Sequence, residues 1–208
     1  MRDLKPSTRV LDMTCGSGVF LVEALRRLVQ LQANGRPITR QLIRKTMKDQ
    51  IFGVDKNEAA IRVASFSLYL TALELDPNPG PPKALRFEPL IGRNLFVADA
   101  LNLGKDTDAR HLCEMRFDAI IGNPPWTYAG SEAKPTWPIG HEPTLPPRSQ
   151  DFAFVWRSIE LAHPRVLRVP ADHAAVKRFG GLGVGRHHVV PDKCPVSVGH
   201  GRLSFRLN

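Results

Sequence analysis

The tetrapeptide Asn123-Pro124-Pro125-Trp126 combines residue types that suit the binding of a planar amine, and it directly follows the apolar run 117–122. Two prolines remove two backbone donors and stiffen the turn, so the Asn123 amide and the Pro124 carbonyl would stand as fixed acceptors. The Trp126 indole offers a flat face, on which stacking of a base contributes about 1–3 kcal/mol. A Pro-Pro stop beside a core tryptophan would explain the prolines but not all four residues. The tetrapeptide therefore predicts a site for an exocyclic amino group on a stacked ring.

A second candidate site is the glycine turn Cys15-Gly16-Ser17-Gly18, which lies between Asp12 and Phe20. Glycines at 16 and 18 allow the backbone to approach a ligand that any Cβ would repel. The spacing differs from the dinucleotide fingerprint, and the lysine of a phosphate-binding loop is absent. We therefore expect the turn to pack against a nucleoside with an amino-acid tail, whose ammonium group Asp12 would face. The alternative is an ordinary tight turn that Asp12 caps.

Asp55 and Asp99 each end an apolar run that reads as a strand. A carboxylate in the position of Asp55 commonly accepts hydrogen bonds from ribose hydroxyls. The alternative for Asp55 is a carboxylate stabilised by the dipole of the following helix. Asp99 either faces an adenine amino group or caps a loop. The two residues indicate a binding site only because they end consecutive strands; neither does so alone.

The segments between these residues alternate between strand and helix patterns. Strands are expected at 9–13, 50–55, 94–99 and 117–122, and helices at 19–31, 38–48, 58–75 and 151–162. In the third helix, Phe66 and Leu68 are expected in the core. Such alternation predicts a Rossmann-like α/β fold, a parallel sheet flanked by helices. Ligands bind at the carboxyl ends of such strands, so Asp12, Asp55, Asp99 and Asn123 are expected to face one crevice.

The composition of the 208 residues fits one α/β domain and excludes collagen, coiled coil and wholesale disorder. No run approaches the ~20 apolar residues of a membrane span, so no membrane association is expected. Three cysteines without a CxxC pair, and the absence of an apolar leader, favour a reduced, cytoplasmic setting. The histidines and Cys194 match no standard zinc spacing, so no metal site is expected.

The CGSGxF turn and the NPPW tetrapeptide together resemble class I S-adenosylmethionine-dependent methyltransferases. More narrowly, they resemble the N6-adenine DNA methyltransferases of restriction–modification systems, over roughly residues 8–163. The resemblance implies that six residues contact the methionine part of S-adenosylmethionine: Asp12, Cys15, Gly16, Ser17, Gly18 and Phe20. It also implies that Asp55 binds the cofactor's ribose, that Asp99 lies near its adenine, and that residues 123–126 are catalytic. Met13 occupies a place that is often proline in this family.

The function implied by the resemblance is methyl transfer to the N6 amino group of adenine in DNA. Acceptors at Asn123 and Pro124 would draw the N–H groups out of conjugation and concentrate the nitrogen lone pair toward the sulfonium methyl. A duplex adenine must be flipped out, with Trp126 as its stacking partner. The expected partners are DNA and a specificity or restriction subunit.

Two other functions stay open. NPP-aromatic tetrapeptides also serve methyltransferases that act on RNA bases or on protein glutamine, although the CGSGxF form and the long insertion before Asp55 favour DNA by resemblance. The other reading is a non-catalytic remnant or a cofactor-binding subunit. A sheet without its later strands leaves an open edge, which predicts poor solubility or dependence on a partner.

The composition changes at Pro164. Residues 164–208 hold eight basic and two acidic side chains and so carry most of the chain's net charge of +9. The positive charge of the whole chain is therefore weak evidence that residues 1–163 bind DNA. We divide the chain into residues 1–163, a partial methyltransferase catalytic domain truncated after about the fourth strand, and residues 164–208, an irregular basic tail. The family usually has sequence before the first strand, so we expect the domain to be incomplete at both ends. The tail resembles an out-of-frame translation of a GC-rich gene; the alternative is a poorly ordered segment that contacts phosphates.

Overall fold

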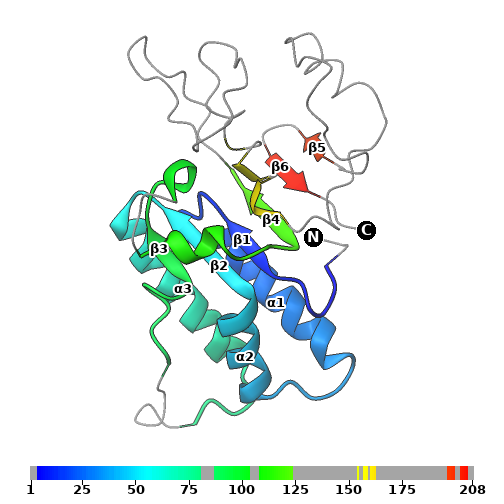
Figure 1. Ribbon diagram of the computed structural model, residues 1–208. Helices are drawn as coiled ribbons and strands as arrows, with labels where there is room; N and C mark the ends of the chain where they lie inside the picture. The colour runs from blue at the N-terminus through cyan, green and yellow to red at the C-terminus, as the bar shows by residue number, and fades with distance from the viewer. Residues whose placement is uncertain are drawn as a thin grey trace, which may run out of the picture.

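The sheet forms the centre of the computed structural model, which describes residues 4–80, 87–103, 108–123, 154, 157, 158 and 160–162, and the backbone of 196–199 and 202–205. Four strands are parallel: β1 (Val10–Asp12), β2 (Ile51–Asp55), β3 (Leu95–Val97) and β4 (Ala119–Gly122). In space they follow the order β3-β2-β1-β4 (Figure 1). The predicted parallel α/β sheet is confirmed.

Two further short strands extend the sheet beyond β4. β6 (Arg202–Phe205) pairs antiparallel with β4, and β5 (Val196–Gly199) pairs antiparallel with β6. The expectation of an irregular tail is therefore wrong for these eight residues, which form paired strands. Strands this short carry little pattern of their own, because their pairing depends on the free edge that a neighbour offers. The division of the chain at residue 163 stays a prediction.

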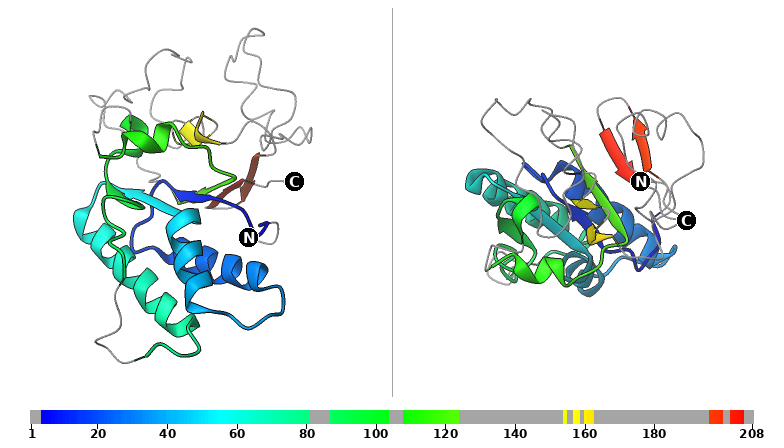
Figure 2. Two further views of the ribbon diagram at one scale, coloured as in Figure 1. Left: turned by 60° about the horizontal axis from the view of Figure 1, so that its bottom comes forward. Right: turned by 45° about the horizontal axis from the view of Figure 1, so that its top comes forward.

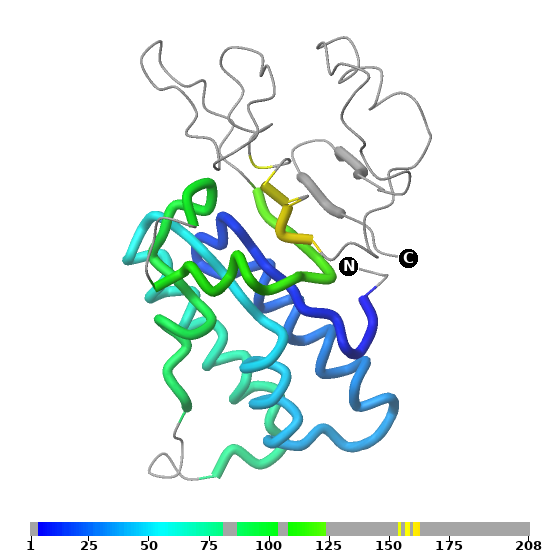
Figure 3. The backbone as a smooth tube through the Cα atoms, in the orientation of Figure 1, coloured from blue at the N-terminus to red at the C-terminus, as the bar shows by residue number. Residues whose placement is uncertain are grey.

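Three helices cover one face of the sheet: α1 (Val19–Ala33), α2 (Arg40–Gln50) and α3 (Glu58–Leu75) (Figures 1 and 2). Local signals set their ends. Asn34, in the left-handed conformation at φ 47°, ends α1; the Thr39 hydroxyl accepts from Leu42 N at the start of α2. Asn57 caps α3 by accepting from Ala59 N and Ala60 N, as an asparagine before the first helical residue commonly does. The chain thus alternates between sheet and helical layer, as Figure 3 traces.

Apolar side chains alternate between the two faces of the sheet. Val10 and Ile51 pack with buried residues of α1, α2 and α3. Leu11 and Phe52 point to the other face, where they pack with the 3-10 helices η2 (Ala100–Asn102) and η3 (Arg110–Cys113) and with Phe154, Leu161 and Ala162. Both faces of the sheet are covered, which is the usual requirement of a parallel sheet. None of the helices in this described part is both long and apolar enough to cross a bilayer.

Phe66 does not belong to this core. Its side chain is 61% exposed, whereas Leu68, two residues later, is fully buried. α3 is apolar around much of its circumference, so hydrophobicity alone did not say which side faces the sheet. The expectation that Phe66 is a core residue was wrong.

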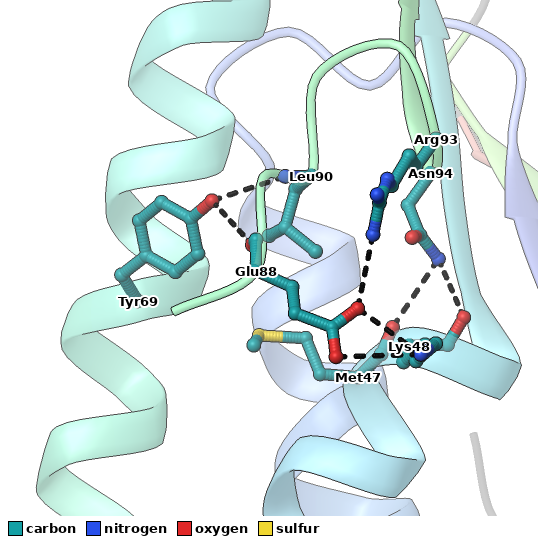
Figure 4. A network of polar contacts seen from close by, with 7 residues as sticks. All are labelled: Met47, Lys48, Tyr69, Glu88, Leu90, Arg93 and Asn94. Atoms are coloured by element: carbon teal, nitrogen blue, oxygen red, sulfur yellow. Dashed lines mark hydrogen bonds and ion pairs between the residues drawn. The ribbon is translucent and has the colours of Figure 1, made fainter. Parts of the chain in front are cut away.

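Asn94 fixes the joint between α2, β2 and β3; Figure 4 shows its side-chain amide bonded to the Met47 and Lys48 carbonyls at the end of α2. Its side-chain amide donates to the carbonyl oxygens of Lys48 and Ile51, both at 2.8 Å, and to that of Met47 at 3.4 Å. The Met47 and Lys48 carbonyls are among the last four of α2, which have no partner within the helix, Ile51 begins β2, and Asn94 itself is buried. Asn94 therefore supplies the donor that the helix end lacks.

Replacing Asn94 by aspartate is expected to lower the free energy of unfolding by about 1–3 kcal/mol, because it removes the donor and brings a carboxylate against carbonyl oxygens. Urea denaturation followed by circular dichroism measures the change. The control is Asn78→Asp, because Asn78 is exposed and uses only its backbone in the hydrogen bonds of this region. Equal stability of the two variants would show that Asn94 does not hold this joint.

Candidate functional site

The carboxyl ends of β1, β2 and β4 meet at one edge of the sheet. In the strand register Asp12 lies beside Gly53 on one side and Ile121 on the other. Asn123 follows directly after β4, so the chain leaves the sheet next to the glycine turn that follows Asp12. Asp55 pairs with Val97, and Asp99 lies two residues farther along. The structure therefore places Asp12, Asp55, Asp99 and Asn123 at the same edge, as the strand pattern predicted.

The glycine turn is tied to the end of β2 by two hydrogen bonds. The backbone N–H of Gly16 donates to Asp55 Oδ2 at 2.9 Å, and that of Cys15 donates to the Val54 carbonyl at 3.0 Å. Asp55 Oδ1 accepts from Asn57 N at 2.8 Å. Asp55 thus holds both the turn and the start of α3. Its predicted contact with a ribose stays a prediction.

Gly16 and Gly18 differ in what surrounds them. Both have positive φ, at 51° and 83°, which favours glycine. A Cβ on Gly16 would meet nothing within 4 Å, whereas a Cβ on Gly18 would lie 3.0 Å from Ala64 Cβ on α3. Gly16 therefore leaves its side of the turn open to a ligand. Gly18 lets the turn pack closely on α3, and its own contact with a cofactor stays a prediction.

Asp12 is fully buried at the end of β1. Its Oδ1 accepts from Thr14 N at 3.0 Å, so it does cap the turn, but its Oδ2 has no hydrogen-bond partner within the described part of the chain. Burial, opposed by the Thr14 hydrogen bond and reinforced by the negative charge of Asp55, raises the pKa of Asp12 to about 7. A buried carboxylate with a free oxygen is a feature that a cationic ligand would satisfy.

The other residues of the motif take supporting positions. Cys15 is buried, and this burial, together with the charges of Asp12 and Asp55, raises the pKa of its thiol, so it is inert as a nucleophile. Ser17 is exposed and Phe20 half-buried. The predicted cofactor contacts of these three residues are compatible with their places at the turn and stay predictions.

Asp99 caps η2 and pairs with a cation. Its carboxylate accepts from Leu101 N at 3.1 Å and from the Asn102 side chain at 2.9 Å, and Lys56 Nζ lies 3.1 Å away. Although partial burial acts to raise it, the hydrogen bonds from Asn102, Lys56 and Leu101 hold the pKa of Asp99 below its usual range. The loop-capping alternative is thus observed, and a contact between Asp99 and an adenine stays a prediction.

The backbone just before Asn123 lies close to Asp12. A Cβ on Gly122 would lie 3.0 Å from Thr14 Oγ1 and 3.2 Å from Asp12 Oδ1. The residue before Asn123 therefore touches the residues that open the glycine turn. Neither Thr14 nor Gly122 was among the predicted site residues, although each adjoins a motif. Pro124, Pro125 and Trp126 lie outside the described residues.

A hollow also opens at the opposite edge of the sheet. It has a volume of about 1430 Å³ and is lined by residues that precede the strands, among them Arg9, Gln50 and Asn94. Those residues mark the amino ends of β1, β2 and β3, opposite the edge where the acidic strand ends gather. This hollow is therefore separate from the edge that carries the candidate site.

The profile of a family described as N-6 DNA Methylase matches residues 1–167. The chain belongs to this family. The resemblance read from the glycine turn and the NPPW tetrapeptide is thereby confirmed.

Two curated relatives match part of this N-6 DNA methylase chain. The type II restriction enzyme and methyltransferase RM.Eco57I of Escherichia coli is 23% identical over 58% of this chain and 14% of the relative. The adenine-specific methyltransferase PglX of Streptomyces coelicolor is 39% identical over 95 residues, which are 45% of this chain and 8% of the relative. The chain thus spans only a small part of the length of these relatives.

Two solved structures resemble the chain more distantly. One is a nuclease-deletion mutant of the Type ISP restriction–modification enzyme LlaGI in complex with a DNA substrate mimic; it has 18% identity and a TM-score of 0.45, over 59% of this chain and 10% of that one. The other is the M protein of the type I restriction enzyme EcoKI, with 20% identity and a TM-score of 0.46, over 77% of this chain and 29% of that one.

Proposed function

We propose that this chain carries the catalytic core of an N6-adenine DNA methyltransferase of the restriction–modification type. The observation that carries the proposal is that Asn123 directly follows Gly122, whose backbone lies close to Asp12 and Thr14 at the start of the glycine turn. Membership of the N-6 DNA methylase family supports it, as do relatives named as adenine-specific or as restriction enzyme and methyltransferase. Its partners would be DNA, with the target adenine flipped out, and a specificity or restriction subunit. It would act in the cytoplasm.

S-adenosylmethionine is the methyl donor that the site fits. The unpartnered Asp12 Oδ2 suits the donor's ammonium group, and the open side of Gly16 leaves room for its amino-acid tail. Asp55 would bind the ribose, and Asp99 would lie by the adenine. When bound, S-adenosylmethionine supplies an electrophilic methyl group on a positively charged sulfur.

Asn123 would hold the acceptor in this proposal. Its amide oxygen and the carbonyl of Pro124 would accept hydrogen bonds from the N6 amino group, so the nitrogen lone pair is directed toward the methyl group rather than into the ring. A bond forms between N6 and the methyl carbon, the bond from that carbon to sulfur breaks, and N6 then loses a proton to solvent. The chain itself contributes alignment, which accounts for much of the barrier lowering in such transfers. Trp126 would stack on the flipped base.

A methylation assay with radiolabelled S-adenosylmethionine tests the proposal. The full chain is supplied with adenine-containing DNA, RNA or protein as acceptor, and label in N6-methyladenine is quantified. Transfer to DNA alone is the expected result. Transfer to RNA or to glutamine would move the enzyme to one of the alternative acceptor classes, and cofactor binding without transfer to any acceptor would identify a non-catalytic cofactor-binding subunit.

A further inference from the structure

The hollow at the amino ends of the parallel strands carries an excess of positive charge. Its volume of about 1430 Å³ exceeds the roughly 300–1,000 Å³ of a typical small-molecule pocket. Two acidic residues line it, Asp49 and Glu88. The basic residues that line it are Arg9, Arg40, Arg44, Lys45, Lys48 and Arg93. We call it the basic hollow, and its size suits part of a macromolecule rather than a metabolite.

One acidic side chain already occupies part of the basic hollow. Lys48 Nζ and Arg93 Nη1 each lie 3.0 Å from Glu88 Oε2, and Figure 4 shows Glu88 between the two cations. The hydrogen bond and charge of Lys48, together with the charge of Arg93, hold the pKa of Glu88 below its usual range. A carboxylate is thus the kind of group that these cations bind.

The remaining cations leave charge for a partner. Arg40 pairs with Asp76 at 2.6 Å. Arg9, Arg44 and Lys45 form no ion pair with any residue that the structure describes. Three positive side chains therefore line the basic hollow without an anion from the described part of the chain.

Arg44 is held by an aromatic ring and not by an acid. Its guanidinium carbon lies 5.7 Å from the centroid of the Phe87 ring, and Phe87 stacks on Tyr69 with 4.8 Å between the ring centroids. Arg44 Nε is buried and has no hydrogen-bond partner among the described residues. A guanidinium presents its N–H donors in a fixed fork that matches the two oxygens of a carboxylate. Arg44 is therefore positioned to bind a carboxylate from outside.

Apolar side chains lie among the cations of the basic hollow. Pro89 is exposed, and Phe87 and Met115 are half-buried. A DNA backbone would supply negative charge but no apolar group for these surfaces, whereas a polypeptide with acidic and apolar residues supplies both. The lining thus favours a protein partner over a nucleic acid.

The basic hollow is also remote from the candidate active site. It lies at the amino ends of the strands, and β2 has five residues at a rise of about 3.3 Å, so about 17 Å separate it from the edge that carries Asn123. A partner in the hollow therefore leaves the other edge free for its own ligands.

We propose that the basic hollow docks an acidic, amphipathic segment of a partner protein. Arg44 binds one carboxylate of the segment, Lys45 attracts its negative charge, and apolar side chains of the segment pack against Phe87 and Met115. Complementary charge of this kind speeds the encounter and selects the partner. The inference goes beyond the proposed function and stands without it.

Fluorescence anisotropy of the full chain with a labelled peptide tests this docking surface. The peptide consists of glutamate, alanine and leucine, with the leucines spaced to form one helical face. Two matched peptides replace either every glutamate by glutamine or every leucine by serine. We expect saturable binding of the first peptide that weakens as salt is added, and at least about tenfold weaker binding of each matched peptide.

Arg44→Gln is expected to lower the affinity for the glutamate–leucine peptide about tenfold, because it removes charge-assisted hydrogen bonds. Lys45→Gln, at an exposed position, should lower it about threefold. The matched control is Arg36→Gln, which removes the same charge from an exposed residue outside the lining and should change the affinity by less than about twofold. Thermal melting shows which variants fold; if Arg44→Gln does not fold, Lys45→Gln carries the test.

A short duplex of G·C pairs distinguishes a nucleic-acid surface, because it offers no adenine to the candidate active site. We expect the unaltered chain and Arg44→Gln to bind this duplex equally. A greater loss for the duplex than for the peptide would assign the basic hollow to nucleic acid and overturn the proposal. Absence of saturable peptide binding, equal binding of the glutamine peptide, or an equal loss in Arg36→Gln would overturn it as well. All of these results leave the proposed methyl transfer unaffected.

Discussion

Replacing Asn123 by alanine is expected to lower the rate of adenine methylation by at least about 100-fold, an effect comparable to removing one preorganised hydrogen-bonding group from an active site. Asn123 follows β4 at the edge where Asp12 and the glycine turn lie. The substitution removes the acceptor for the N6 amino group and changes no residue of the glycine turn. Single-turnover methylation with saturating S-adenosylmethionine measures the rate, and titration of the cofactor should show a change below about twofold.

The control for this experiment is Asn78→Ala, which removes an exposed amide that lies beyond α3. It should methylate at the rate of the unaltered chain. If Asn123→Ala retains more than about a tenth of the activity, the amide is not an essential acceptor. If it loses cofactor binding as strongly as activity, Asn123 acts on the cofactor and its assigned role is wrong.

Replacing Asp12 by asparagine is expected to abolish cofactor binding and at the same time to stabilise the free protein. The pKa of Asp12 is raised to about 7 from an ordinary value of 3.8, so the folded state binds the proton more tightly than the unfolded state. This proton linkage favours folding below about pH 4, and the contribution is lost as the pH rises through about 7. Asparagine keeps the acceptor for Thr14 N but carries no charge, so above pH 7 the variant should be more stable by an amount on the order of a few kcal/mol.

Urea denaturation of both proteins between pH 4 and pH 8 measures the stability difference, which should grow with pH across this window. Binding of S-adenosylmethionine by the unaltered chain should follow the opposite trend. Its affinity should fall about fourfold from pH 8 to pH 6, because the ammonium binds the ionised carboxylate. This loss is partly offset by fuller protonation of the donor's own α-amino group, whose pKa is about 7.8. A pH-independent affinity, or an asparagine variant that is less stable at pH 8, would contradict the assigned role of Asp12.

Parts of the site could be predicted because they depend on local chemistry. A short apolar run followed by an acidic residue, a glycine turn and an amphipathic segment predicts strand, turn and helix. The parallel arrangement then puts consecutive strand ends at one edge. That reasoning placed Asp12, Asp55, Asp99 and Asn123 correctly. The cap at Asn57 was predictable for the same local reason.

Other features depended on contacts between segments far apart in the sequence. Phe66 is exposed because the other side of α3 meets the sheet. Since α3 is apolar on more than one side, the sequence alone did not show which side that is. The role of Asn94 at the end of α2 required segments more than 40 residues apart to meet. The strands β5 and β6 depended on the open edge of β4. The local sequence pattern predicts none of these three features.

By itself the sequence determined the order of the elements, the family and the candidate residues for binding a cofactor and an amine, because turn geometry and hydrophobic period are local properties. Only the tertiary structure decided that Asp12 keeps one oxygen unpartnered, that Asp55 binds Gly16 N, and that Gly122 lies against Thr14. Burial and hydrogen bonding belong to atoms that folding brings together. The chemistry available to a carboxylate is set by those neighbours and not by its place in the chain.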